Sequence, residues 1–396
     1  MTLTSTTRIR GADGLRAIAC LLVVGHHLTQ RLNGHNYAGL LGKMHYAGMR
    51  GEVGVSLFFV LSGCLLSVPF WRALVHKQQT PKMGTYVINR VARIVPAMWV
   101  NLILVSLLAI PVVNYGWNWA RVFSSMFFVN IFDYRTFFPA ELNGPLWSIG
   151  FEVWCYILLP LVLIPIIKFC RSVKSAFIAI VLTIISLQAL NPWILHAFET
   201  DDLAKGWQYG MTGGAKLWLP YWNVGSFFSQ FLIGSLVALG ITWLDTKSES
   251  RRLHYDFLGI VFFISAFTVV WFRVQPGAPD RYTHQPYAAP MFAILIGLCL
   301  FFVSHSTVTY RILDNSLFRW IAKISFGIYL WHMVFIMVIA SKVNNHFVFY
   351  GMNSGWHWLK LSAVVVLGAV LMASASWYLL ENPILKKAHQ YTRHRP

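Results

Sequence analysis

The chain has 396 residues, of which 57% are hydrophobic and only 12% charged, with a mean hydropathy of +0.56. This charged fraction is about half that of ordinary soluble domains, so composition excludes a soluble globular protein and predicts a polytopic membrane protein with one helical core. The net charge is +18, but the 32 Lys and Arg residues are scattered at the ends of apolar runs, which points to membrane orientation and not to a nucleic-acid partner.

Ten apolar runs are long enough to cross a bilayer. Backbone groups in lipid must be satisfied within their own segment, so runs of this length predict α-helices and not barrel strands. The predicted helices cover residues 14–31, 52–71, 94–113, 146–167, 175–195, 222–244, 255–273, 287–304, 324–343 and 358–380. The apolar stretch 122–132 is too short to span, and we expect it to be re-entrant or interfacial.

The distribution of basic residues predicts the orientation of these helices. With the N-terminus inside, 21 of the 32 Lys and Arg residues fall on the cytoplasmic side or at helix ends there. Cytoplasmic loops carry an excess of Lys and Arg, so both termini are expected inside. We therefore expect an all-α bundle forming a single transmembrane domain over residues 1–396, with short cytoplasmic tails at about 1–12 and 384–396.

Three predicted outer loops, at residues 114–145, 196–221 and 274–286, are long and rich in aromatic residues. Aromatic side chains at these edges commonly anchor a protein at the membrane interface. The same side chains stack on sugar rings. The sequence leaves both readings open.

The first predicted helix carries the most unusual polar pattern. The segment DGLRAIACLLVVGHH, Asp13 to His27, places an acid, an arginine and two histidines around nine uncharged residues. At about 100° and 1.5 Å per residue, Arg16 and His27 share a face roughly 16 Å apart along the axis, while His26 points about 100° away. Ionisable groups within a membrane helix normally face a protein interior or a water-filled cavity. The pattern fits either a packed structural histidine or a functional base.

Two motifs follow in the second and third helices. GVSLFFVLSG, residues 54–63, has small residues at Gly54, Ser62 and Gly63, which predicts close helix packing. Arg90 and Arg93, in INRVARIVP, share a face at the inner edge of the third helix, level with Arg16. Three arginines at one rim suit phosphate groups, which guanidinium binds bidentately. Ordinary positive-inside residues that contact lipid head groups are the alternative.

Further ionisable residues lie in later helices. Glu152, in GPLWSIGFEVWCY, lies about six residues below the outer end of its helix, at a depth similar to that of His27, and Ser148 shares its face. Glu152 suits either a structural ion pair with an arginine or support for the histidine. His332, in ISFGIYLWH, lies near mid-depth, where it either lines the same cavity or bonds to a neighbouring helix. Glu381 ends the last helix, where we expect a structural stop.

Six motifs, in this order, resemble those of the acyltransferase 3 family of integral-membrane acyltransferases. They are DGLRAIACLLVVGHH, GVSLFFVLSG, NRVARIVP, LWSIGFEVWCYILLP, ISFGIYLWH and LLENP, and they cover residues 10 to 385. The resemblance places the family's arginine–histidine pattern on Arg16 and His27, which selects His27 over His26. It places the paired arginines on Arg90 and Arg93. The Trp-Ser-x-x-x-Glu element falls on Trp147, Ser148 and Glu152.

The resemblance implies an enzyme that moves an acyl group, commonly acetyl, from cytoplasmic acyl-CoA to a sugar hydroxyl. Acceptors would be surface polysaccharide, peptidoglycan or a small glycosylated product. The protein would be located in the bacterial cytoplasmic (inner) membrane. Some relatives carry an additional hydrolase-like domain, which we do not expect here, so separate polysaccharide-assembly partners are a further expectation. No metal is expected.

The predicted site combines these residues. Arg16, Arg90 and Arg93 would bind the CoA phosphates, His27 would act as general base, and Glu152 would orient its ring. Substrate-binding or supporting roles are assigned to Trp147, Ser148, His332 and Ser62. An acyl-histidine intermediate is the alternative chemistry. The competing class is a secondary transporter or flippase of a sugar or lipid-linked sugar, which would normally show paired halves, and no such repeat is visible.

Overall fold

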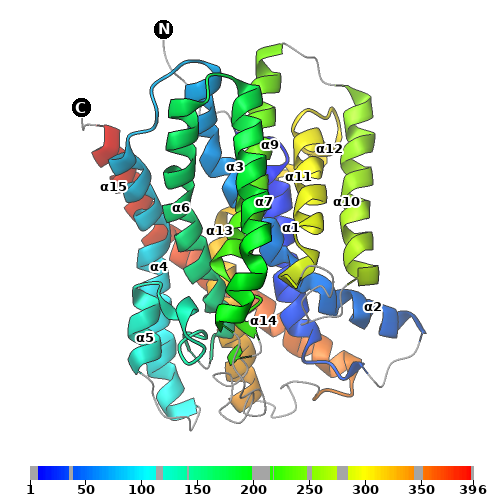
Figure 1. The fold of residues 1–396 in the computed structure, drawn as a ribbon. Helices are drawn as coiled ribbons and strands as arrows, with labels where there is room; N and C mark the ends of the chain where they lie inside the picture. Colours follow the sequence, from blue (N-terminus) through cyan, green and yellow to red (C-terminus); the bar gives the residue numbers. More distant parts are fainter. Residues whose placement is uncertain are drawn as a thin grey trace.

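Helices form almost all regular structure in the described part of the chain. The computed structural model describes residues 8–34, 39–112, 119–140, 142–198, 215–216, 218–247, 252–273, 284–342 and 351–393. Within these ranges the only β pairing is an isolated bridge between Leu32 and Met352. The chain is therefore an all-α polytopic membrane protein, as its composition predicts (Figure 1).

Each of the ten predicted segments forms a helix. They are α1 (Ala12–Thr29), α3 (Gly54–Val75), α4 (Met83–Val112), α6 (Trp147–Phe169), α7 (Val173–Phe198), α9 (Val224–Leu244), α10 (Leu253–Arg273), α11 (Met291–Ser304), α13 (Ser316–Lys342) and α14 (Gly355–Ser376). Nine stretches of the described residues, which include every one of these helices except α1, are long and apolar enough to cross a bilayer. Helix α1 is more polar because it carries Asp13, Arg16 and two histidines.

Some boundaries differ from the prediction. Helix α4 begins at Met83, eleven residues before the expected start, because its first turns are polar and extend past the apolar run. Helix α13 likewise begins at Ser316, eight residues early. The short apolar stretch 122–132 forms no spanning helix but contributes to α5 (Trp119–Met126) and the 3-10 turn η3 (Asn130–Phe132).

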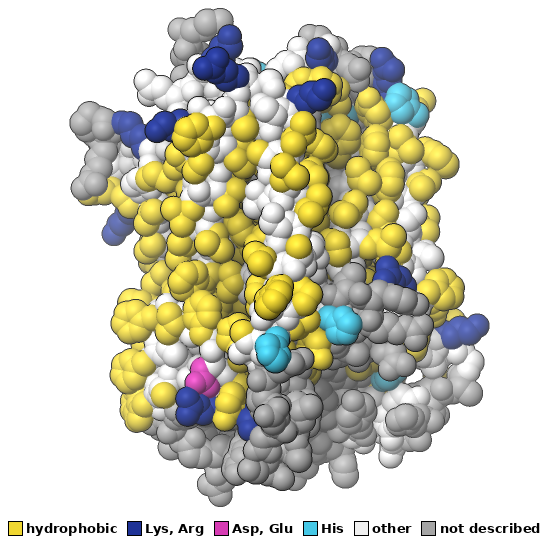
Figure 2. Space-filling model, viewed as in Figure 1, with side chains coloured by type: hydrophobic (Ala, Val, Ile, Leu, Met, Phe, Trp, Pro, Cys, Tyr) yellow, Lys and Arg dark blue, Asp and Glu magenta, His cyan; other side chains and the backbone are white. Residues whose placement is uncertain are grey.

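Additional short elements flank the membrane helices. These are α2 (Gly39–Met49), the 3-10 turn η2 (Arg50–Val53), α12 (Thr309–Leu313), the π-helical turn η8 (Trp377–Glu381) and α15 (Asn382–Arg393). Helix α1 begins and α15 ends at the same end of the bundle, which we call the terminal end (Figure 1). Helix α2 lies near the opposite, distal end. Lys and Arg side chains gather at the terminal end, above a broad hydrophobic belt (Figure 2).

The predicted close packing of the GVSLFFVLSG segment is confirmed. A Cβ atom added to Gly63 would lie 1.9 Å from the carbonyl oxygen of Phe231 on α9. One added to Gly54 would lie 2.4 Å from the carbonyl oxygen of Ala19 on α1. Because both obstacles are backbone atoms, only glycine permits these approaches. Helix α3 is thereby held against α1 on one side and α9 on the other, and this arrangement brings Ser62 to the site described next.

Candidate functional site

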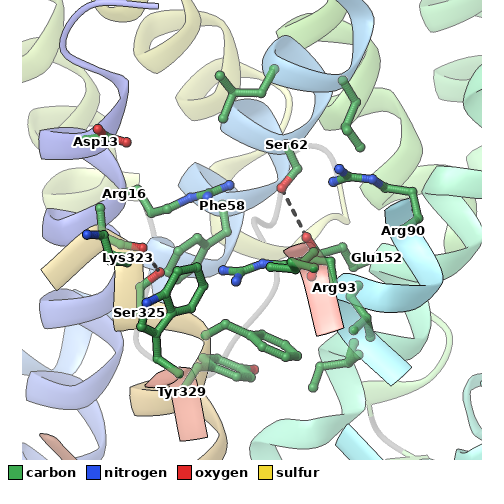
Figure 3. A pocket seen from close by; sticks show the side chains of 18 of the residues that line it. Asp13, Arg16, Phe58, Ser62, Arg90, Arg93, Glu152, Lys323, Ser325 and Tyr329 are labelled. Carbon is green, nitrogen blue, oxygen red and sulfur yellow. Dashed lines mark hydrogen bonds between the residues drawn. The ribbon is translucent and has the colours of Figure 1, made fainter. Parts of the chain in front are cut away.

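A pocket of about 780 Å³ lies between α1, α3, α4, α6 and α13 (Figure 3). Its wall extends from Arg8, Arg319 and His389 near the terminal end to Ser148 and Tyr329 at its deep end. This volume lies within the range of small-molecule and cofactor sites.

The pocket has a clear excess of positive charge. The basic residues in its wall, histidine apart, are Arg8, Arg16, Arg90, Arg93, Arg319 and Lys323. Its acidic residues are Asp13 and Glu152, and Asp13 forms an ion pair with Arg8. Guanidinium groups converging on one cavity suit a ligand with phosphate groups. The structure thus brings the three predicted arginines together, pointing into a common space (Figure 3).

The three arginines differ in their partners. Arg93 Nη1 lies 3.1 Å from Glu381 Oε2, and its guanidinium lies over the rings of Trp377 (5.3 Å) and Phe326 (5.6 Å). Glu381 is only 1% exposed, and the Ser376 hydroxyl also donates to it, at 3.0 Å. Within the described chain no carboxylate pairs with Arg16 or Arg90, so their charges remain available to a ligand. Glu381, expected to be only a structural stop, also fixes Arg93 through the η8 turn.

Glu152 lies in the pocket wall on α6 and faces α3. Its Oε1 accepts a hydrogen bond from the Ser62 hydroxyl at 3.0 Å, and another from the Tyr156 hydroxyl one turn further on (Figure 3). The sequence left two alternatives for Glu152, an ion pair with an arginine or contact with the histidine. The observed hydrogen bonds match neither of them. Two hydroxyl donors instead satisfy the carboxylate.

The deep end of the pocket is formed by hydroxyl and aromatic groups. The Tyr329 hydroxyl donates to the carbonyl oxygen of Pro145 at 2.6 Å and lies 2.6 Å from Ser148 Oγ. The ring of Phe58 meets the ring of Tyr329 edge to face, with centroids 6.4 Å apart. The Tyr329 ring also lies 5.8 Å, centroid to centroid, from the ring of His332, which is not part of the pocket wall. Sequence reasoning missed Tyr329, although it lies in the ISFGIYLWH motif three residues before His332.

The histidines form a separate group beyond this deep end. The His27 ring centroid lies 4.9 Å from that of His26 and 5.2 Å from that of His332, which in turn lies 5.8 Å from the Tyr329 ring. His332 is fully buried, its Nδ1 bonds to the Ile328 carbonyl at 3.1 Å, and its Nε2 has no hydrogen-bond partner among the described residues. His27 is half-buried and bonds through Nδ1 to Gln30 Oε1 at 3.1 Å.

The predicted residues therefore fall into two places. Those that line the pocket are Arg16, Ser62, Arg90, Arg93, Ser148 and Glu152, and those that do not are His27, Trp147 and His332. Trp147 stacks on Phe137, with centroids 5.6 Å apart, and packs within the aromatic core.

The expected pairing of Glu152 with His27 is not present. No hydrogen bond joins these two described side chains, since Glu152 bonds to Ser62 and Tyr156 while His27 bonds to Gln30. Similar depth along two helices does not fix the direction in which each side chain points. Helix α6 presents Glu152 to α3, whereas α1 presents His27 to α13.

The sequence also underestimated the contribution of α13 to the pocket. Arg319 and Lys323 lie four residues apart and so share a helix face. Their spacing could have indicated two cations on one side of α13, but both residues were used only to predict membrane orientation. Among the described residues no group of three or more His, Cys, Asp or Glu side chains is arranged to hold a metal ion.

Fold and site together define a class: an integral-membrane helical bundle with an arginine-lined pocket at one end and a histidine cluster beyond its deep end. The chain belongs to the acyltransferase 3 family, whose model, described as an acyltransferase domain, matches residues 9–374.

Three curated relatives illustrate the similarity. The chain is 24% identical to the peptidoglycan O-acetyltransferase OatA of Listeria monocytogenes, over 94% of this chain and 55% of that protein. It is 24% identical to nodulation protein 10 of Rhizobium leguminosarum bv. viciae, over 93% and 90%. It is 26% identical to the putative peptidoglycan O-acetyltransferase YrhL of Bacillus subtilis, over 95% and 55%. The chain thus spans about half the length of OatA and YrhL. No solved structure gives a significant match.

Proposed function

We propose that the protein is a membrane-embedded O-acyltransferase, and specifically an O-acetyltransferase of the bacterial cytoplasmic membrane. The donor is cytoplasmic acyl-CoA, and the acceptor is a hydroxyl of a sugar in a surface polysaccharide or glycosylated product. The observation that carries this proposal is the arginine-lined pocket, whose deep end lies against the group of histidines in a chain of this family.

The terminal end of the bundle faces the cytoplasm in this proposal. The charge distribution supports this orientation, because basic side chains gather at that end (Figure 2). The mouth of the pocket then faces the compartment that supplies acyl-CoA. Arg16 and Arg90, which pair with no carboxylate among the described residues, bind the phosphates, and Lys323 adds a third cation on α13.

The acyl end of the donor reaches the deep end of the pocket, and the Phe58 and Tyr329 rings must move aside for it to reach His27. The ring of His332 connects the two sites, since its centroid lies 5.8 Å from that of Tyr329 and 5.2 Å from that of His27. Eleven residues of α1 separate Arg16 from His27, which is roughly 16 Å along the axis. An extended acyl-pantetheine arm therefore has to cover that distance between its phosphates and its thioester.

His27 is the general base in the proposed reaction. The acceptor hydroxyl gives its proton to the imidazole while its oxygen attacks the thioester carbonyl carbon, a role typically worth about 10²–10⁴-fold in rate. The carbon–sulfur bond then breaks, and the proton passes to the sulfur so that CoA leaves as the thiol. The buried Nε2 of His332 bonds to no described residue, which suits an additional contact to the acceptor hydroxyl group.

Glu152 serves the donor side in this scheme. Its carboxylate organises Ser62 and Tyr156 in the wall next to Arg90, whose guanidinium lies 5.9 Å from the Tyr156 ring centroid. It therefore shapes the wall that the pantetheine arm passes. This replaces the sequence-based expectation that Glu152 orients the imidazole.

The experiment uses the full-length protein in lipid nanodiscs with acetyl-CoA and a polysaccharide acceptor. CoA release and the acetyl mass increment on the acceptor are measured together. We expect His27→Ala to lose at least 100-fold in transfer while acetyl-CoA affinity is kept. His305→Ala, which removes a histidine outside the pocket wall, is the matched control. Full transfer by the His27 variant would refute the proposal.

A further inference from the structure

Gln30, directly after α1, lies between two adjacent histidines and bonds to both. Its Oε1 lies 3.1 Å from His27 Nδ1, and its Nε2 lies 3.0 Å from His26 Nε2. The other nitrogen of His26, Nδ1, lies 2.7 Å from the carbonyl oxygen of Met49, the last residue of α2. A continuous row of hydrogen bonds therefore runs from the backbone of α2 to the ring of His27.

The direction of every bond in this row follows from the carbonyl at its start. A carbonyl oxygen can only accept, so His26 Nδ1 must carry the hydrogen. In a neutral imidazole the other nitrogen then accepts, and the amide Nε2 of Gln30 donates to it. The amide oxygen of Gln30 is thereby turned towards His27, so His27 Nδ1 must also carry its hydrogen.

The opposite arrangement is disfavoured by burial. If the amide were reversed, its oxygen would face the lone pair of His26 Nε2, and only a charged His26 would satisfy it. His26 is 5% exposed, so its charged form would be largely removed from water. Only one arrangement therefore satisfies all these groups with neutral rings, and it leaves the Nε2 lone pair of His27 free.

We propose that Gln30 is a positioning residue that holds His27 in the tautomer with a basic Nε2. This inference rests on the proposed role of His27 as general base. A base needs its lone pair on the nitrogen that meets the substrate, and a hydrogen bond at the other nitrogen decides which nitrogen that is. This proposal also gives His26 a role, because His26, held by the Met49 carbonyl, orients the Gln30 amide.

Other groups around His27 are consistent with this assignment. Within the part of the chain that the structure describes, the titratable or charged side chains that interact with it are His26 on α1, His332 on α13, and Arg31, the residue after Gln30. None of them is a carboxylate that would fix the ring as the acid of a hydrolase triad does. The neutral amide of Gln30 holds the ring orientation instead.

The test compares two variants in nanodiscs. Gln30→Met keeps the length of the side chain but cannot bond to either histidine, and Gln30→Glu keeps an oxygen acceptor for His27 Nδ1. We expect Gln30→Met to lower kcat about fivefold or more, as loss of one net hydrogen bond would, with an unchanged KM for acetyl-CoA. Gln30→Glu should recover part of the loss. Gln188→Met, which removes a half-buried glutamine of α7 bonded to Ser229, is the matched control.

A spectroscopic readout separates this inference from the proposed function. In ¹⁵N-histidine NMR of the full protein, His27 should show Nδ1–H and an unprotonated Nε2, and Gln30→Met should mix the two tautomers. A wild-type ring protonated at Nε2, or an unchanged tautomer in Gln30→Met, would overturn the inference whatever the activity. If His27→Ala kept full activity, the proposed function would fail, while the NMR result would still decide how Gln30 acts. If Gln30→Met did not fold, the wild-type spectrum alone would decide.

Discussion

The contrast between Arg90 and Arg93 gives the sharpest prediction from the pocket. Both arginines line it, but among the described residues a carboxylate pairs with Arg93 alone, Glu381 at 3.1 Å. Glu381 is 1% exposed, so Arg93→Ala would leave an uncompensated buried charge. Breaking a buried ion pair in this way typically costs about 3–5 kcal/mol. Arg90→Ala creates no such charge and should change the free energy of unfolding by less than about 1 kcal/mol.

Binding should show the reverse order. A charge-assisted hydrogen bond to phosphate contributes about 1.5–3 kcal/mol, so Arg90→Ala should weaken acetyl-CoA binding about 10- to 150-fold. Arg93 already forms an ion pair with Glu381 and lies over two aromatic rings. Its replacement should therefore weaken acetyl-CoA binding by a smaller factor. Stability and affinity should therefore separate the two neighbouring arginines. The sequence alone had assigned them the same role.

Thermal unfolding in nanodiscs and calorimetric titration with acetyl-CoA measure the two quantities. The double variant Arg93→Ala/Glu381→Gln removes the buried charge together with its partner, and should regain most of the stability that Arg93→Ala loses. Equal stability losses for Arg90→Ala and Arg93→Ala would refute the reasoning. A larger affinity loss for Arg93→Ala than for Arg90→Ala would refute it as well.

The remaining predictions concern the α3 interfaces. Gly63→Ala should destabilise the protein by about 1–3 kcal/mol, because the added Cβ would lie 1.9 Å from a backbone oxygen of α9. Gly84→Ala on α4, where a Cβ meets nothing within 4 Å, should be neutral or stabilising in the same unfolding assay, and equal losses would contradict the account of close packing. Glu152→Gln keeps an oxygen to accept from Ser62, so it should reduce turnover much more than stability. If this variant kept wild-type turnover, the proposed role of Glu152 on the donor side would be refuted.

The fold was largely predictable because its signals are local. Apolar runs of bilayer length located ten helices, nine of which lie in described stretches apolar enough to cross a bilayer, and the glycines of α3 indicated its close contacts. Helix ends were less predictable, since α4 continues for eleven residues beyond its apolar run through polar turns that contain Arg90 and Arg93. Helices end where their hydrogen bonds end, and hydropathy does not report this.

The site was predictable in part, and the failures have one cause. Depth along each helix predicted that Arg16, Arg90 and Arg93 would lie at one level, and the three do line one pocket. Depth also suggested that Glu152 would meet His27, which depends on the rotation and neighbours of two helices. Side chains such as Gln30 carry no distinguishing sequence signal, because an amide becomes informative only when its partners are known.

The central proposal is that an acyl group passes from acyl-CoA at the terminal end of the bundle to a sugar acceptor on the other side of the membrane, and that CoA itself does not cross. Proteoliposomes with the terminal end outward, loaded with a polysaccharide acceptor, test it most directly. Acetyl-CoA labelled separately in its acetyl and nucleotide parts is added outside only. The account predicts acetyl label on the enclosed acceptor and nucleotide label that remains outside, both dependent on His27. Transfer that occurs only when acetyl-CoA is enclosed with the acceptor would contradict it.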